Sequence, residues 1–195
     1  MKRVQELIVI DPGGAWNGHN TQGGSRRENY FPPEGAGALR RNWRVLLRIF
    51  FALVWSLDAY FKWLYVDNGE SLVDTISSSA QGQPGFAKGW IDFWAGISAS
   101  VPNFTLLVAI FETLVALFLL LGLLTPAISA TGIMFNLLIW STAEGFGGIF
   151  QSGATDIGTG PLYAAIFAGL IVIQAGRQKG IDGLLHRKFP TLPFW

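Results

Sequence analysis

FTLLVAIFETLVALFLLLGLL, residues 104–124, decides the fold class, because this stretch contains a single charged side chain, Glu112. An α-helix of about 20 predominantly apolar residues crosses the roughly 30 Å hydrocarbon core of a bilayer. Three further stretches of similar length are predicted to cross as well: residues 45–66, 126–143 and 157–175. The last two carry no charge, whereas the first contains three. The sequence therefore predicts four membrane spans.

The composition of the whole chain agrees with this prediction. Of the 195 residues, 50% are hydrophobic and 14% are charged, and the mean hydropathy is +0.37. An average soluble domain has about 25% charged residues. We therefore expect an all-α fold, an integral membrane four-helix bundle with an interfacial amphipathic helix and an extended N-terminal tail.

Several classes of function are disfavoured by what the chain lacks. The net charge is +1 and no run of basic residues occurs, so nucleic acid is not an expected partner. The absence of cysteine excludes disulfides, thiol catalysis and cysteine-held metal. The two histidines, His19 and His186, lie outside the predicted spans, so a bis-histidine haem is not expected. This chain alone is expected to hold neither haem nor metal, and a redox centre would come from a diffusible cofactor or a partner.

The distribution of charge predicts the orientation of the spans. Basic residues gather before the first span and after the last: Arg40, Arg41, Arg44, Arg177, Lys179, Arg187 and Lys188. Loops rich in Lys and Arg stay in the cytoplasm, so both termini of this multi-pass protein are predicted to lie on the cytoplasmic side of the cell membrane. The predicted parts are a soluble tail over 1–40, the bundle over 41–176 and a C-terminal tail over 177–195. The N-terminal tail is rich in turn-forming residues, which is typical of a flexible terminus. Its aromatic residues, Trp16, Tyr30 and Phe31, favour the alternative of a segment that folds on a partner.

The connection over residues 67–103 is too long for a simple turn. In its second half, aromatic and aliphatic residues recur at spacings of three and four: Phe86, Trp90, Phe93, Trp94 and Ile97. That spacing predicts one apolar stripe on a helix. Two interpretations remain open, a helix lying in the membrane interface and a lid packed on the bundle.

Charged residues inside the predicted spans are candidates for function, because a charge at mid-depth costs about 2.5 to 3.5 kcal/mol. Asp58 and Glu112 each lie about eight residues, roughly 12 Å, from the outer ends of their spans. Lys62 is one turn from Asp58 and is expected to pair with one or both acids. Either the three residues lock helices together as an ion-pair network, or they form a polar pocket that exchanges protons with a quinol.

The loop from Trp140 to Tyr163 is rich in Gly, Ser and Thr and contains two acids, Glu144 and Asp156. Irregular backbone beside lipid persists only against protein or a water-filled cavity. We expect this loop to roof the polar pocket. Asp156 then joins Asp58, Lys62 and Glu112 as a candidate catalytic residue. Candidate cofactor-binding residues are Arg48, Trp63, Glu144 and Trp140, although Arg48 lies nearer the cytoplasmic end and snorkelling to the interface is an alternative for it.

Three segments resemble the DoxX/DoxD family of small four-helix membrane proteins: LLRIFFALVWSLDAYFKW over 46–63, FETLVALFLLLGLLTP over 111–126 and GATDIGTGPLYA over 153–164. The resemblance covers about residues 43–176, and its most specific part is the TDIG sequence before the last span. It implies a membrane subunit of a thiosulfate:quinone oxidoreductase, paired with a small DoxA-like subunit and passing electrons to a membrane quinone. Positions that match the polar positions of the family pattern are Arg48, Lys62, Glu112 and Asp156.

Two functions from different classes follow. The first is a quinone-linked redox subunit that acts with a partner. The second is a non-catalytic accessory or assembly subunit of a larger respiratory or other energy-converting membrane complex, which the lack of cysteine and membrane histidine favours. In both, the partners are membrane lipid and other membrane or membrane-associated subunits. A small-solute transporter is a weaker third, because no repeat or pair of broken helices is evident.

Overall fold

The structure is a computed structural model that describes residues 36–153 and 155–189, with residues 36–41 described by their backbone alone. The predictions for the tail over 1–35 and for residues 190–195 lie outside this part. The helices are α1 (Ala36–Asp67), α2 (Leu72–Ser79), α3 (Gly85–Ser100), α4 (Phe104–Leu121), α5 (Thr125–Ser141), the 3₁₀ helix η1 (Gly145–Gly148), α6 (Gly160–Val172) and α7 (Ile181–Lys188). The described residues contain no strand, so the all-α prediction is confirmed for them.

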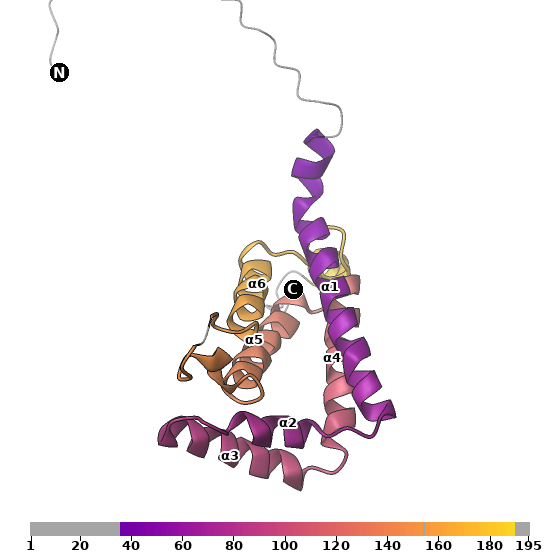
Figure 1. Ribbon diagram of the computed structural model, residues 1–195. Coiled ribbons are helices and arrows are strands. Elements are labelled where there is room, and N and C mark those ends of the chain that lie inside the picture. The colour runs from indigo at the N-terminus through magenta and orange to yellow at the C-terminus, as the bar shows by residue number, and fades with distance from the viewer. Residues whose placement is uncertain (1–35, 154, 190–195) are drawn as a thin grey trace, which may run out of the picture. The chain divides into compact units, whose positions relative to one another are not determined.

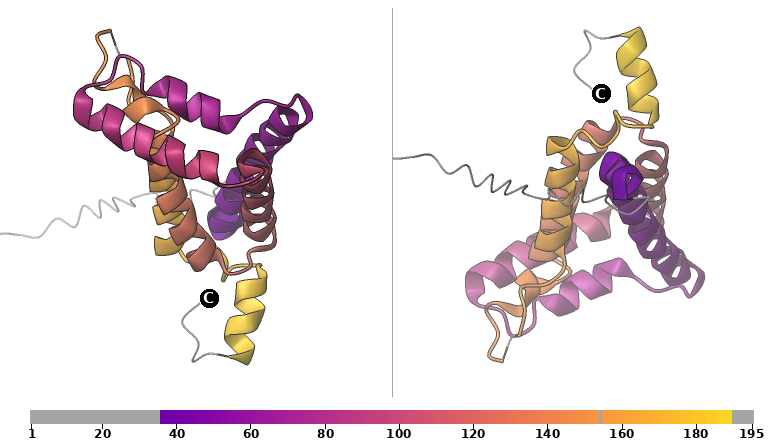
Figure 2. Two further views of the ribbon diagram at one scale, coloured as in Figure 1. Left: turned by 90° about the horizontal axis from the view of Figure 1, so that it is seen from below. Right: turned by 90° about the horizontal axis from the view of Figure 1, so that it is seen from above.

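The long helices form two pairs, α1 with α4 and α5 with α6. The pairs meet at one end and diverge toward the other, where α2 and α3 lie across the gap (Figure 1). Views along the bundle show the same arrangement, with α2 and α3 reaching from one pair to the other (Figure 2). We call these the narrow end and the wide end.

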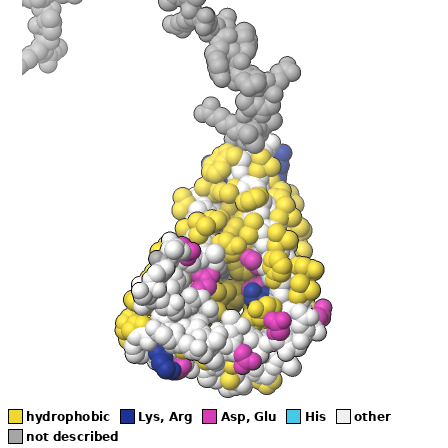
Figure 3. Space-filling view, viewed as in Figure 1, with side chains coloured by type: hydrophobic (Ala, Val, Ile, Leu, Met, Phe, Trp, Pro, Cys, Tyr) yellow, Lys and Arg dark blue, Asp and Glu magenta, His cyan; other side chains and the backbone are white. Residues whose placement is uncertain are grey.

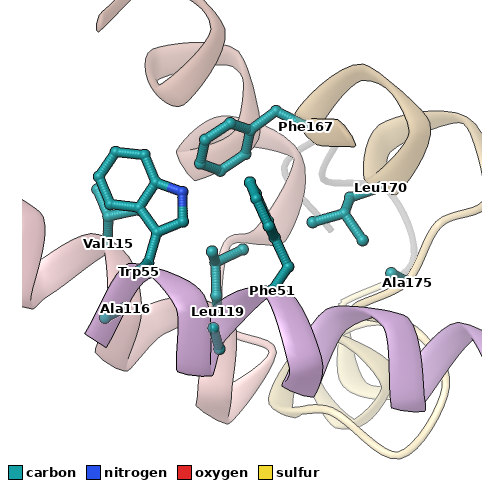
Figure 4. Packing of buried hydrophobic residues seen from close by; sticks show 9 residues of the cluster. Phe51, Trp55, Val115, Ala116, Leu119, Phe167, Leu170 and Ala175 are labelled. Carbon is teal, nitrogen blue, oxygen red and sulfur yellow. The ribbon is translucent and has the colours of Figure 1, made fainter. Parts of the chain in front are cut away.

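The hydrophobic core lies where the two pairs meet. Phe51 and Trp55 of α1 point toward Phe167 of α6 (Figure 4), and the ring centroids of Phe51 and Phe167 are 4.8 Å apart in an edge-to-face contact. The rest of this buried cluster comes from α1, α4, α6 and the segment that follows α6: Ala52, Val115, Ala116, Leu119, Leu170 and Ala175. Helices from both pairs therefore share one core.

Capping at the narrow end explains where α4 ends and α5 begins. Gly122 ends α4 in the left-handed conformation, at φ +62°, and Pro126 lies in the first turn of α5, as its position in the sequence favours. The buried carboxylate of Asp182, at the start of α7, accepts hydrogen bonds from the backbone N–H groups of Leu124 and Thr125 at 2.6 and 2.8 Å. A side chain far along the chain thus satisfies the free donors of α5.

The structure confirms helices in all four predicted spans but changes their lengths. Among the described helices, α4 is the one that is both long and apolar enough to cross a membrane, with a mean hydropathy of 2.6 over 18 residues. Its neighbour α5 has 17 residues. Helix α6 has 13 residues, fewer than the predicted last span, because that span includes loop residues 157–159 and turn residues after Val172. Helix α1 begins at Ala36, within the predicted tail. That the other helices cross a membrane stays a prediction.

The predicted stripe lies on α3, where four of its five residues are exposed and the fifth, Trp94, is half-buried. Phe86 is 67% exposed and Phe93 is 57% exposed, and Trp90 and Ile97 are also exposed. The side of α3 that packs inward consists of smaller residues: Ala87, Ile91, Ala95 and Ser98. Two stripe residues nevertheless contact the bundle, since Trp90 Nε1 donates to Ser141 Oγ at 3.1 Å and Trp94 lines a cavity inside it. The interfacial helix and the lid therefore both stay predictions.

Candidate functional site

The wide end brings charged residues from α1 and α4 together. Lys62 Nζ of α1 lies 3.6 Å from Glu112 Oε1 of α4. The Glu112 side chain is 3% exposed and the Lys62 side chain is 25% exposed, so the pair runs from the interior to the surface. The second carboxylate oxygen, Glu112 Oε2, is buried and has no hydrogen-bond partner among the described residues. It remains able to accept a hydrogen bond or a proton.

Asp58 and Tyr163 extend this group. Asp58 lies one turn before Lys62 on α1, is partly buried, and interacts electrostatically with both Lys62 and Glu112. The Tyr163 hydroxyl of α6 interacts with the Asp58 carboxylate as a hydrogen-bond donor. The sequence prediction did not include Tyr163 as a site residue. The sequence feature that could have indicated it is its position at the start of an uncharged span, directly after the TDIG loop.

These four residues, Asp58, Lys62, Glu112 and Tyr163, are named here the wide-end cluster. Space-filling shows a hollow on this face of the molecule, with acidic and basic side chains at its rim and apolar surface over the upper helices (Figure 3). The cluster combines two acids, a cation and a phenol from helices of the bundle, and one oxygen of Glu112 has no hydrogen-bond partner among the described residues. Such a set can donate and accept protons at one place.

An inner cavity of about 220 Å³ adjoins the cluster, and Lys62 is the charged residue in its lining. The other lining residues come from α1 to α5 and the turn after α5 and are mainly apolar: Phe61, Tyr65, Leu72, Thr75, Ile76, Trp94, Ser98, Phe104, Val108, Phe135, Leu138, Ile139, Thr142 and Ala143. A few polar groups in an apolar hollow are typical of small-molecule sites. The cavity suits an apolar ring with a polar atom directed at Lys62.

The loop between α5 and α6 is held by its own acids and aromatics. Glu144 accepts hydrogen bonds from the Thr159 backbone N–H at 3.0 Å, the Gly160 N–H at 3.1 Å and the Thr159 hydroxyl. These contacts cap the N-terminus of α6, where a negative charge is favourable. Trp140 Nε1 donates to the carbonyl of Ile157 at 2.7 Å. Glu144 and Trp140 therefore hold the loop, and Glu144 also acts electrostatically on Tyr163.

Close backbone contacts explain why this loop needs glycine. A Cβ at Gly147, which has φ +62°, would overlap the carbonyl of Ile157. Asp156 is exposed, and its Oδ1 accepts from the Gly158 N–H at 2.8 Å. This is a local turn contact. The structure places no contact between Asp156 and the wide-end cluster.

Arg48 lies at the other end of the bundle from the cluster, and Trp63 does not line the inner cavity. Arg48 is 2% exposed at the narrow end, where its Nη1 donates to the Ala175 carbonyl at 3.1 Å. A Cβ at Gly122 would overlap its guanidinium, so the side chain occupies space that glycine leaves and does not snorkel. Trp63 is 37% exposed, and its Nε1 donates to Thr113 Oγ1 at 3.0 Å between α1 and α4.

Comparison with known proteins adds no further assignment. No protein-family model, no curated protein and no solved structure matches this chain. Within residues 36–153 and 155–189, no three His, Cys, Asp or Glu side chains come together as a metal site would require.

Proposed function

We propose that this chain is a DoxD-like membrane subunit linked to quinone redox chemistry, which passes electrons from thiosulfate to quinone together with a partner subunit. The observation that carries the proposal is the wide-end cluster beside an apolar cavity. A quinone is an apolar ring with two carbonyl oxygens, and its reduction takes up two electrons and two protons. The cavity suits the ring, Lys62 suits an oxygen, and Glu112 suits proton exchange.

Location in the cell membrane is part of the proposal. Only 33% of the residues in the apolar window of α4 are buried inside the described structure. Large apolar side chains are also exposed on the other helices, as with Phe50 at 64%, Met134 at 74% and Val172 at 81%. Soluble monomers rarely expose apolar surface over such an extent. Lipid is the environment that suits these faces.

The electron donor requires a partner. Thiosulfate is a dianion, and the exposed side chains at the wide end include Asp67, Glu70 and Asp74, which repel it. A DoxA-like small subunit with a cationic surface would receive the donor and deliver electrons to the cavity. In this arrangement the chain binds the quinone and moves its protons.

An accessory or assembly role is the second candidate, and one observation favours it. The Lys62–Glu112 pair joins α1 to α4, and an ion pair of this kind stabilises a helix pair without any chemistry. In that case, removal of the chain would disassemble a larger complex.

Thiosulfate-dependent reduction of a short-chain quinone, measured on the chain purified with its partners, tests the proposal. We expect Glu112→Gln to lower the turnover by about 10²-fold or more, as loss of a proton-transferring group does, and to alter its pH dependence. The matched control is Asp92→Asn, which removes an exposed acid paired with Lys88 at 2.6 Å and should leave turnover unchanged.

Unchanged turnover and pH profile in Glu112→Gln would contradict the proton role. An inactive complex that nevertheless falls apart without this chain would favour the accessory role.

A further inference from the structure

The inner cavity has a neighbour between α3, α4 and α5. A groove of about 580 Å³ lies there, and its lining includes Trp90, Phe111, Met134 and Leu137. Met134 is 74% exposed, and Trp90 and Leu137 are each 42% exposed. The groove therefore opens on the outer face of these helices, which the proposed function places in lipid.

The groove and the inner cavity share a wall. Trp94, Phe135 and Leu138 belong to the lining of both. The ring centroids of Phe135 and Phe111 are 4.6 Å apart, and the Trp94 ring stands edge-on to that of Trp90 at 5.8 Å. Three side chains thus separate an apolar groove from the cavity beside Lys62.

Trp94 has an unsatisfied polar group at this wall. Its buried Nε1 has no hydrogen-bond partner among the described residues, and an unpaired buried N–H is costly. A ligand with an oxygen at the wall would relieve this cost. The side chain that separates the two hollows is therefore one that gains from binding an oxygen-bearing molecule.

The sizes of the two hollows indicate what kind of ligand uses both. The inner cavity, at about 220 Å³, is smaller than the roughly 300 to 1,000 Å³ of common ligand pockets, whereas the groove is within that range. A ring fits the cavity, and a longer apolar chain requires the groove.

We propose that a ring compound with an apolar tail enters sideways from the lipid through the groove between α4 and α5. Its ring passes Trp94 and Phe135 to lie beside Lys62, and its tail stays along Met134. Water-soluble partners then approach the charged rim of the hollow at the wide end, and the lipid-soluble ring compound enters through the groove. This inference rests on the proposed quinone-linked function and adds the route and the position of the tail.

Photolabelling locates the tail without relying on activity. The probe is a decyl-benzoquinone with a diazirine in its tail, added to the full chain in lipid nanodiscs, with labelled residues mapped by mass spectrometry. We expect label on α4 and α5 along the groove, and its removal by excess benzoquinone that lacks a tail. Met134→Trp, which fills the groove, should lower this labelling several-fold, and Leu137→Trp provides a second variant if the first does not fold.

The matched control is Val172→Trp on α6, at a position 81% exposed and outside the groove lining, and it should label as the native chain does. Two results would overturn the lateral route while leaving quinone binding in place. One is label on α1 or α6 that excess benzoquinone removes, and the other is equal labelling of all variants. Labelling that excess benzoquinone does not compete would overturn the quinone-linked function itself.

Discussion

At the scale of single residues, the buried and half-buried charges differ in what their polar atoms contact. Arg48 and Asp182 at the narrow end bind backbone groups, and Glu144 does the same at the start of α6. Glu112 differs, because one of its oxygens pairs with Lys62 and the other has no hydrogen-bond partner within the described part. Chemistry is therefore expected at Glu112, and structural roles at the other three.

The Lys62–Glu112 pair predicts a specific pattern of stability. Lys62→Met leaves Glu112 buried without its cation and should lower the free energy of unfolding by about 3 to 5 kcal/mol. The double variant Lys62→Met, Glu112→Leu should recover most of this loss, because neither charge then remains buried. Unfolding in detergent micelles measures both.

Lys88→Met is the matched control, since Lys88 and Asp92 are about half exposed and such pairs contribute about 0 to 1 kcal/mol. If Lys62→Met were as stable as the native chain, Lys62 and Glu112 would not be energetically coupled.

Glu144→Ala removes the cap of α6 and should lower the free energy of unfolding by about 1 to 2 kcal/mol, as loss of a helix cap does. Hydrogen exchange should rise over residues 145–153 and 155–160 in particular, because the Thr159 and Gly160 N–H groups lose their acceptor. Glu70→Ala, at an exposed acid of the connection after α1, is the control. Equal exchange in both variants would argue against Glu144 as the anchor of the loop.

At the scale of elements, α3 places most of its aromatic stripe outward, whereas Trp94 and the smaller residues of the helix lie inward. Ile91 is fully buried, whereas Phe93, two residues later, is 57% exposed. The inward side joins α3 to α2 and to the loop near Phe146. An outward aromatic stripe on a helix that lies across the bundle end is typical of a helix in the membrane interface.

Spin labelling tests this placement, and the chain suits it because it has no native cysteine. A label at Phe93→Cys in liposomes should be more accessible to oxygen than to a water-soluble nickel complex, as expected within the interface. A label at Ser77→Cys, an exposed position on α2, provides the comparison in water. Equal accessibility to the nickel complex at both sites would contradict an interfacial α3.

At the scale of the whole described unit, charge is separated between its two ends. The connections of the wide end carry exposed acids, among them Asp67, Glu70 and Asp74, whereas α7 ends in the exposed bases Arg187 and Lys188. Such separation is the pattern that orients membrane proteins. The two ends are therefore expected on opposite sides of the membrane, with the cluster in the outer half.

Single cysteines report this orientation. In intact cells, a membrane-impermeant maleimide should label Asp74→Cys from outside, and should label Arg187→Cys only after lysis. Both positions are exposed, so neither result depends on burial. Labelling of both variants in intact cells would contradict the four-span topology.

The positions of the helices followed from the sequence because hydropathy and helix signals are local. Residues 104–121 form α4, Pro126 lies in the first turn of α5, and the spacing of Phe86, Trp90 and Phe93 indicated α3. The proximity of Asp58 and Glu112 was also predictable, since helix rise converts residue number into distance, and the two side chains interact electrostatically.

The partners of the side chains, by contrast, were decided by the tertiary structure. How helices distant in sequence pack and rotate determines four features. These are the pairing of Lys62 with Glu112, the presence of Tyr163 in the wide-end cluster, the capping role of Glu144 and the burial of Arg48. The divergence of the two helix pairs, which opens the cavity, has the same origin. A sequence pattern determines which face of a helix is apolar, but only packing determines which neighbour that face meets.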